Sequence, residues 1–114
     1  MPFSPQVEQW RSLFRRLGSD LPTEFLLAWL SKESGGLECA TGIPGVEAGI
    51  FQTFHPADDR FGATFAQLRA NCVPNTQQIT RPLTSAEAEL QVSSGIRYVR
   101  AMIAAAKRKL AAAG

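Results

Sequence analysis

The sequence lacks the features that mark several classes of protein. It has no apolar run of roughly 18 residues, so no segment is expected to span a membrane. Its first residues lack the basic stretch followed by an apolar stretch that forms a signal peptide. Residues 1–114 contain no internal repeat and no long linker, and they suffice for one domain with a core. We therefore expect a single domain that is a cytosolic product, an excised piece, or cargo exported by another route.

An excess of charge of either sign is also missing. The 12 Lys and Arg residues nearly balance the 10 Asp and Glu residues, which leaves a net charge of +2. This excess is too small to indicate a nucleic-acid partner. The one basic cluster, Lys107-Arg108-Lys109, comes at the end of the last helical pattern, where it complements the negative end of the helix dipole. The composition is that of an ordinary soluble globular protein, and it does not indicate an oligomeric state.

Cysteine and histidine are rare. Cys39 and Cys72 are the only cysteines, and His55 is the only histidine. Two thiols and one imidazole are a weak basis for a metal site, so we expect no metal and no cofactor. The cysteines either form one disulfide, which suits an oxidising compartment, or remain two buried thiols. We favour the disulfide because each cysteine lies at or just beyond the end of an expected helix. We expect His55 to be a loop residue rather than a catalytic one.

Helical periodicity is the strongest pattern that is present. Apolar residues recur three and four positions apart in four segments. The expected helices run from Ser4 to Gly18, from Pro22 to Glu33, from Gly62 to Asn71, and onward from the capping-box sequence Thr84-Ser85-Ala86-Glu87. The apolar stripe of the last helix is expected to face the core, and it comprises Val92, Ile96, Val99, Ile103, Ala106 and Leu110. Residues 111–114 are expected to fray. The fold class is therefore mainly α.

The middle third of the chain has a different character. Five glycines and two prolines interrupt residues 35–59, which predicts a loop. Apolar and polar residues alternate from Ile50 to Phe54, which indicates a short hairpin there. Gly95 lies inside the last helix, where glycine costs about 1 kcal/mol relative to alanine, so we expect something to pack closely against it. The sequence thus predicts a helical domain with a glycine-rich loop or short β-hairpin beside the helix that ends at Glu33.

Glu33 is the first candidate for chemistry. It lies in the last turn of an apolar helix, directly before the glycines at 35 and 36. Phe25, Trp29 and Glu33 are four residues apart and therefore share one face. Burial on that face and the negative end of the helix dipole both favour the protonated carboxyl, which a general acid requires. The alternative is that Glu33 simply ends the helix and points into water. We expect Trp29, like Trp10, to belong to the core.

The order and spacing of three motifs resemble those of the lytic transglycosylase and goose-type lysozyme superfamily. They are Glu33-Ser34, the sequence Gly49-Ile50-Phe51-Gln52, and a later helix with Gly95 three residues before Tyr98. The resemblance covers roughly residues 19–54 and 90–103, and it implies a lysozyme-like fold. There are departures: Ile50-Phe51 replaces the commoner Leu-Met, and the family's Ala-Tyr-Asn-type segment has no clear counterpart between Asn71 and Arg81.

The resemblance also implies roles for these residues. Glu33 would be the single acid/base of a lytic transglycosylase, which cleaves the peptidoglycan glycan strand in the cell wall without a cofactor. Ser34 and Gln52 would line the sugar site together with backbone groups near Gly49 and Ile50. Tyr98 would form a hydrogen bond close to Glu33 and orient it. The place of action would be periplasmic or extracellular.

Three other functions remain open at this point. Glu47, two residues before Gly49, is a candidate second carboxylate that would activate water in an inverting muramidase. We expect it instead to be a solvated loop residue. A chitin-type polymer is an alternative substrate. A small helical binding or assembly module, in which Glu33 has no catalytic role, is the non-enzymatic alternative.

Overall fold

The structure is a computed structural model that describes residues 3–18, 20–54 and 61–114. Its elements are α1 (Pro5–Glu8), α2 (Arg11–Leu17), α3 (Thr23–Glu33), β1 (Glu47–Ala48), β2 (Thr53–Phe54), α4 (Phe65–Leu68) and α5 (Ser85–Ala113). The two strands pair antiparallel, with Glu47 opposite Phe54. The protein is mostly helical, which confirms the expected mainly-α class. His55 lies outside the described residues.

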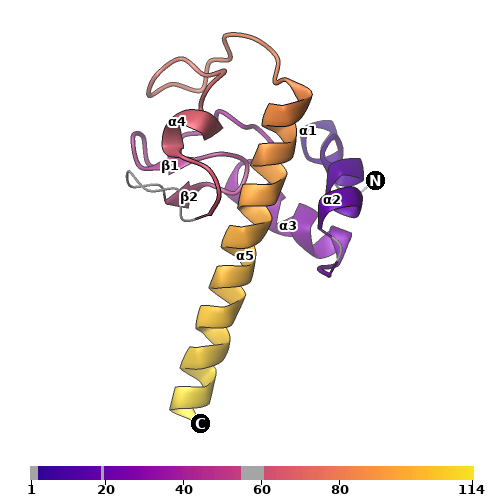
Figure 1. Ribbon diagram of the computed structural model, residues 1–114, viewed down its shortest axis with the longest axis vertical. Coiled ribbons are helices and arrows are strands. Elements are labelled where there is room, and N and C mark those ends of the chain that lie inside the picture. The colour runs from indigo at the N-terminus through magenta and orange to yellow at the C-terminus, as the bar shows by residue number, and fades with distance from the viewer. Residues whose placement is uncertain (1–2, 19, 55–60) are drawn as a thin grey trace.

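Helix α5 lies between two groups of elements (Figure 1). Helices α1, α2 and α3 are on one side of it, and the paired strands with α4 are on the other. Helix α2 packs against both α3 and α5, while α4 contacts α5 and β1. Helix α5 therefore contacts both groups.

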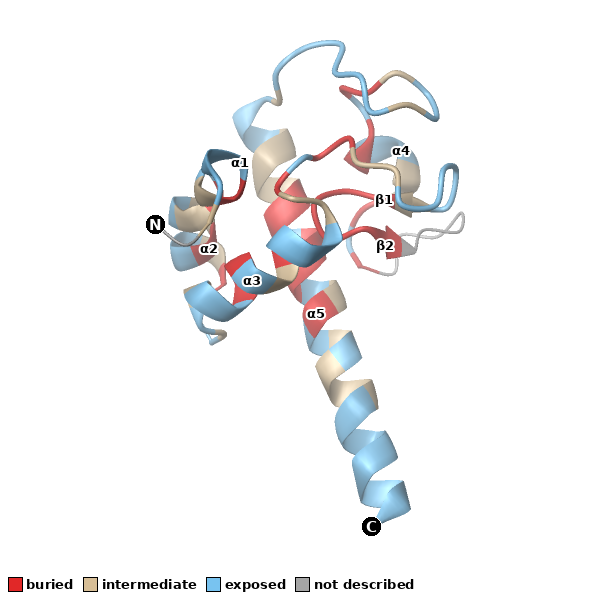
Figure 2. Cartoon of the chain, turned by 180° about the vertical axis from the view of Figure 1, so that it is seen from behind, coloured by how far each residue is buried: buried red, intermediate tan, exposed pale blue. Residues whose placement is uncertain are grey.

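The core gathers where α5 passes between these two groups, as the buried segments in Figure 2 show. The rings of Phe14 and Phe51 are both buried and lie with their centroids 5.7 Å apart. Phe51 also lies directly against Gly95, where an added Cβ would overlap its ring. The expectation of close packing at Gly95 is confirmed, and the partner is the loop that precedes β2.

The expected first helix is divided into two. Helix α1 ends at Glu8 and α2 begins at Arg11, so Gln9 and Trp10 interrupt the helical pattern. At this break the Trp10 indole Nε1 donates a hydrogen bond to the carbonyl oxygen of Gly36, 2.8 Å away. Trp10 is only 4% exposed, which confirms its expected place in the core. The interruption therefore links the N-terminal helices to the chain that leaves α3.

The hairpin is confirmed, but its strands are not the expected ones. Ile50, Phe51 and Gln52 form the turn between β1 and β2 rather than a strand. Gly49 and Gln52 have φ values of 82° and 50°, and such left-handed backbone is incompatible with a strand. Ile50, Phe51 and Gln52 are all buried, so the alternation of apolar and polar residues does not mark two faces here.

The other two helices also differ from expectation in their extent. Helix α4 covers only Phe65–Leu68 of the expected span from Gly62 to Asn71. Beyond it, the Arg69 guanidinium donates to the carbonyl oxygens of Cys39, Val73 and Thr76, which holds the chain in a compact loop. Helix α5 continues through Ala113, whereas residues 111–114 were expected to fray. No helix within residues 3–18, 20–54 and 61–114 is long and apolar enough to cross a membrane.

The prediction that the whole stripe of α5 faces the core is wrong at its C-terminal end. Val92, Ile96 and Val99 are buried, but Leu110 is 73% exposed and Ala106 is also exposed. The reason is that α5 extends past the other described elements, so none of them packs against its last turns (Figure 2). The apolar period alone does not tell where the body of the protein ends.

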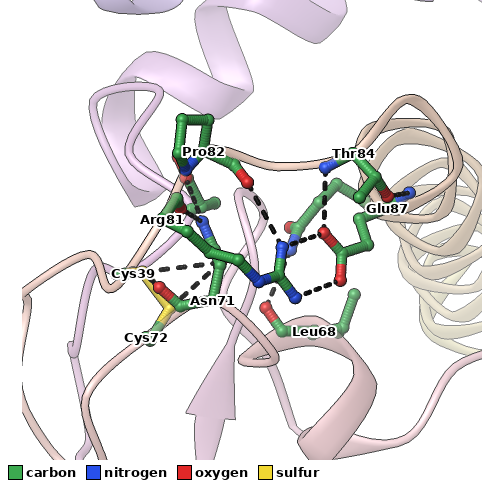
Figure 3. A network of polar contacts seen from close by, with 10 residues as sticks. Cys39, Leu68, Asn71, Cys72, Arg81, Pro82, Thr84 and Glu87 are labelled. Carbon is green, nitrogen blue, oxygen red and sulfur yellow. Dashed lines mark hydrogen bonds and ion pairs between the residues drawn. A yellow bond between two sulfur atoms is a disulfide. The ribbon is translucent and has the colours of Figure 1, made fainter.

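A disulfide and a polar network close the loop region, as Figure 3 shows. Cys39 and Cys72 are bonded, with their Cα atoms 5.7 Å apart, which confirms the favoured alternative. The Asn71 side-chain amide donates to Glu38 Oε2 at 2.9 Å and to the carbonyl oxygen of Arg81 at 3.0 Å. Arg81 in turn forms two hydrogen bonds, of 2.7 and 2.8 Å, with the Glu87 carboxylate in the first turn of α5. The network therefore joins the disulfide region to the start of α5.

Replacing Gly95 by alanine tests the contact between α5 and Phe51. Replacing glycine by alanine inside an exposed helix stabilises that helix by about 1 kcal/mol. Because the new methyl group would overlap the Phe51 ring, we expect Gly95→Ala to lower the free energy of unfolding by about 1–3 kcal/mol, measured by urea denaturation. Ser93→Ala, on the exposed face of the same helix, is the control and should change it by less than about 0.5 kcal/mol. Unchanged or raised stability of Gly95→Ala would contradict the described packing.

The disulfide should contribute measurably to stability because it joins residues 33 positions apart. We expect the double variant Cys39→Ser/Cys72→Ser to lose about 2–4 kcal/mol of unfolding free energy. The wild type measured in excess dithiothreitol should match the double variant, which itself should not respond to the reductant. Equal stability of the oxidised and reduced wild type would show that the cross-link does not constrain the unfolded chain.

Candidate active site

Glu33 is the last residue of α3 and is exposed to solvent. The helix ends there because Gly35 and Gly36 adopt left-handed conformations, with φ values of 66° and 86°. The Ser34 hydroxyl accepts a hydrogen bond of 3.1 Å from the backbone N–H of Gly36. Ser34 therefore stabilises the helix exit, and its expected contact with sugar stays a prediction.

Three effects act on the Glu33 carboxyl. Partial burial raises its pKa above the ordinary value because desolvation disfavours the charged form. The negative charge of Glu47 raises the pKa further, while the Lys32 ammonium lowers it in part. The net direction is upward. A raised pKa shifts this exposed carboxyl toward the property that a general acid requires.

Glu47 and Tyr98 belong to the same electrostatic neighbourhood as Glu33. Burial raises the pKa of the Tyr98 hydroxyl, and the charges of Glu33 and Glu47 raise it further. Glu33 is on helix α3, Glu47 on strand β1 and Tyr98 on helix α5, so three elements contribute to this neighbourhood. Glu47 lies half-buried in strand β1, so the expectation of a solvated loop residue is wrong.

Tyr98 is held by an aromatic contact. Its ring meets that of Phe61 edge to face, with the centroids 5.4 Å apart. Among the described residues, no hydrogen bond joins Tyr98 to Glu33. Their interaction is electrostatic, since the charge of Glu33 raises the pKa of the Tyr98 hydroxyl. A hydrogen bond that orients Glu33 stays a prediction.

Gln52 holds the segment that contains β1 and therefore Glu47. It is 2% exposed, and its Oε1 accepts from the backbone N–H of Gly42 at 2.7 Å. Its Nε2 donates to the carbonyl oxygens of Ala40 and Gly49, each at 2.9 Å. A Cβ at Gly42 would overlap the Glu47 carboxylate, so the missing side chain there leaves room for that carboxylate. Gln52 thus supports the site from inside the protein, and its expected contact with sugar stays a prediction.

Gly49 and Ile50 are also occupied by contacts within the protein. The Ile50 N–H donates to Gln91 Oε1 at 3.0 Å, and the same oxygen would lie 3.0 Å from a Cβ at Gly49. Gln91 Nε2 donates to the carbonyl oxygen of Leu68 at 2.8 Å. Sequence reasoning missed Gln91, although a polar residue directly before Val92 in the buried stripe was a usable signal. A sugar contact by the backbone of Gly49 or Ile50 stays a prediction.

A pocket of about 430 Å³ adjoins the candidate acid on α3. It is lined by Phe25, Ala28, Trp29, Lys32 and Glu33, which all lie on one face of the helix. The rings of Phe25 and Trp29 meet edge to face, with centroids 5.7 Å apart. Trp29 is partly buried against the core and partly lines this pocket, so its expected place inside the core is only half correct.

The described residues contain no group of three or more His, Cys, Asp and Glu side chains that could hold a metal ion. Comparison of the chain with protein-family models, curated proteins and solved structures finds no match. The chemical assignment of the site therefore depends on its own residues.

The raised pKa of Glu33 has a consequence for stability. Folding disfavours the ionised carboxyl, so the penalty is absent below the unfolded-state pKa and complete above the folded-state pKa. We expect Glu33→Gln to melt about 1–3 °C above the wild type at pH 7, and this gain to disappear near pH 4. Glu24→Gln, in the first turn of the same helix, is the control and should show no such gain.

Titration by NMR tests whether Glu47 contributes to the raised pKa of Glu33. Because the charge of Glu47 raises the pKa of Glu33, that pKa should be lower in Glu47→Gln than in the wild type. An unchanged pKa of Glu33 in Glu47→Gln would show that the two carboxylates do not interact.

Proposed function

We propose that the protein is a lytic transglycosylase with a lysozyme-like fold that cleaves the MurNAc-β-1,4-GlcNAc bond of peptidoglycan. The observation that supports this function is Glu33, a solvent-accessible carboxyl of raised pKa at the end of α3. Glu47 and Tyr98, from two other elements, interact with it electrostatically. The motifs around Glu33, Gly49 and Tyr98 resemble those of the lytic transglycosylase and goose-type lysozyme superfamily in their order, and this resemblance suggests peptidoglycan as the substrate.

In the proposed reaction Glu33 acts twice. Its protonated carboxyl first donates the proton to the glycosidic oxygen as the bond to C1 of the MurNAc sugar breaks. The substrate's own N-acetyl group stabilises the cationic sugar. The ionised Glu33 then accepts the proton of the 6-hydroxyl of that sugar, and the oxygen of this hydroxyl bonds to C1. The product has a 1,6-anhydro-MurNAc end, no water is consumed, and Glu33 is protonated again.

Glu47 supports a second candidate function, an inverting muramidase or a chitin-type hydrolase. Its charge acts on both Glu33 and Tyr98, so its carboxylate interacts electrostatically with the candidate acid. In that reaction Glu47 would accept a proton from a water molecule that attacks C1 from the face opposite the leaving group. The two functions differ in whether water enters the product and whether Glu47 is required.

Clearing of purified cell walls tests the catalytic assignment. We expect the wild type to reduce their turbidity and Glu33→Gln to be at least about 100-fold slower, because it cannot donate the proton. Glu24→Gln removes a carboxylate from the other end of the same helix and should clear at about the wild-type rate. Equal clearing by wild type and Glu33→Gln would overturn the catalytic role of Glu33, and clearing by neither would leave the non-catalytic module as the function.

Mass spectrometry of the released fragments separates the two enzymatic functions. A transglycosylase should release 1,6-anhydro ends, and Glu47→Gln should still form them. Products with free reducing ends alone, lost in Glu47→Gln, would assign the protein as a hydrolase.

A further inference from the structure

The face of α3 that leads to Glu33 presents two aromatic rings to solvent. Phe25 is 40% exposed, and Trp29 is only partly packed against the core. Their edge-to-face contact fixes the rings relative to one another on the wall of the pocket that also contains Glu33. The two rings therefore offer an apolar surface beside the candidate acid on which a ligand can pack.

The dimensions of this face suit a chain-like ligand. Phe25 and Glu33 are eight residues apart, which corresponds to about 12 Å along a helix. A ligand extended along this distance would contact the aromatic pair at one end and present a bond to Glu33 at the other. Aromatic rings pack well against the C–H faces of sugar rings, which are broad and weakly polar.

The charge of the pocket distinguishes between two kinds of glycan. Lys32 lies between the aromatic pair and Glu33 in sequence and lines the same pocket. Its ammonium group is near enough to Glu33 to lower the pKa of that carboxyl in part. A chitin-type strand has no anionic group, whereas a peptidoglycan strand has carboxylates on its muramyl side chains. A cation at this place therefore matches the anionic strand.

We propose that this pocket is a glycan subsite next to the cleaved bond, in which Phe25 and Trp29 pack against a sugar ring and Lys32 binds a carboxylate of the strand. The inference rests on the proposed function as a glycan-cleaving enzyme, and it selects an anionic muramyl strand over a neutral one.

The experiment measures binding without turnover, in the Glu33→Gln form of the full chain. The two probes are a neutral tetramer of N-acetylglucosamine and a GlcNAc–MurNAc tetramer with free carboxylates, each titrated calorimetrically. We expect Trp29→Ala and Phe25→Ala to weaken binding of both probes about tenfold. Lys32→Gln should weaken binding of the anionic probe about three- to tenfold and leave the neutral probe within about twofold.

Matched control variants exclude general effects of charge and of apolar surface. Arg15→Gln removes one cation from α2, outside the pocket, and Leu110→Ala truncates an exposed apolar side chain near the end of α5. Neither should change the affinity for either probe. Because Trp29 also contacts the core, Phe25→Ala decides the aromatic role if Trp29→Ala melts well below the others.

Each outcome either supports or overturns the subsite. Unchanged affinity of Phe25→Ala for both probes, or an equal effect of Lys32→Gln and Arg15→Gln on the anionic probe, would overturn it. This failure is separate from that of the proposed function, because the wild type would still clear cell walls. If the wild type clears no walls but Phe25→Ala and Lys32→Gln lose affinity as expected, the subsite stands as the binding site of a non-catalytic module.

Discussion

The contact of the Phe51 ring with Gly95 determines where the middle of the chain lies. Only a residue without a side chain allows the ring to approach α5 this closely. One turn earlier on α5, Gln91 accepts a hydrogen bond from the N–H of Ile50. These two contacts fasten the turn between β1 and β2 to the helix. Because β1 directly precedes that turn, the position of Glu47 follows from them.

The position of Glu33 depends on a different set of contacts. Helix α3 is held by its buried leucines, and the chain that leaves it is held by the hydrogen bond from Trp10 to Gly36. Neither Glu33 nor Glu47 forms a side-chain hydrogen bond among the described residues. The two carboxylates are brought together by packing elsewhere, although their charges repel. Their repulsion is a small electrostatic penalty, which raises the pKa of Glu33. A pair of charged side chains that serves only to stabilise a fold would attract instead.

The local signals in the sequence predicted the end of α3 and the start of α5 well. The glycines after Glu33 and the capping box at Thr84 act within a few residues, so their outcome does not depend on the remainder of the fold. The roles of Gln52 and Gln91 could not be predicted in the same way, because they depend on partners 10 and 41 positions away, respectively. The exposure of Leu110 likewise depends on where the other elements end. A pattern specifies which face is apolar, and only the tertiary structure specifies how far that face is covered.

On the proposed function, the charges around Glu33 also couple binding to chemistry. A carboxyl that acts first as an acid and then as a base must hold a proton and afterwards lose it. Burial and Glu47 favour the protonated form, whereas Lys32 favours the ionised form. An anionic strand bound to Lys32 would neutralise the one effect that lowers the pKa of Glu33. Binding of the strand would therefore raise that pKa further and favour the acid at the moment when the glycosidic oxygen needs a proton.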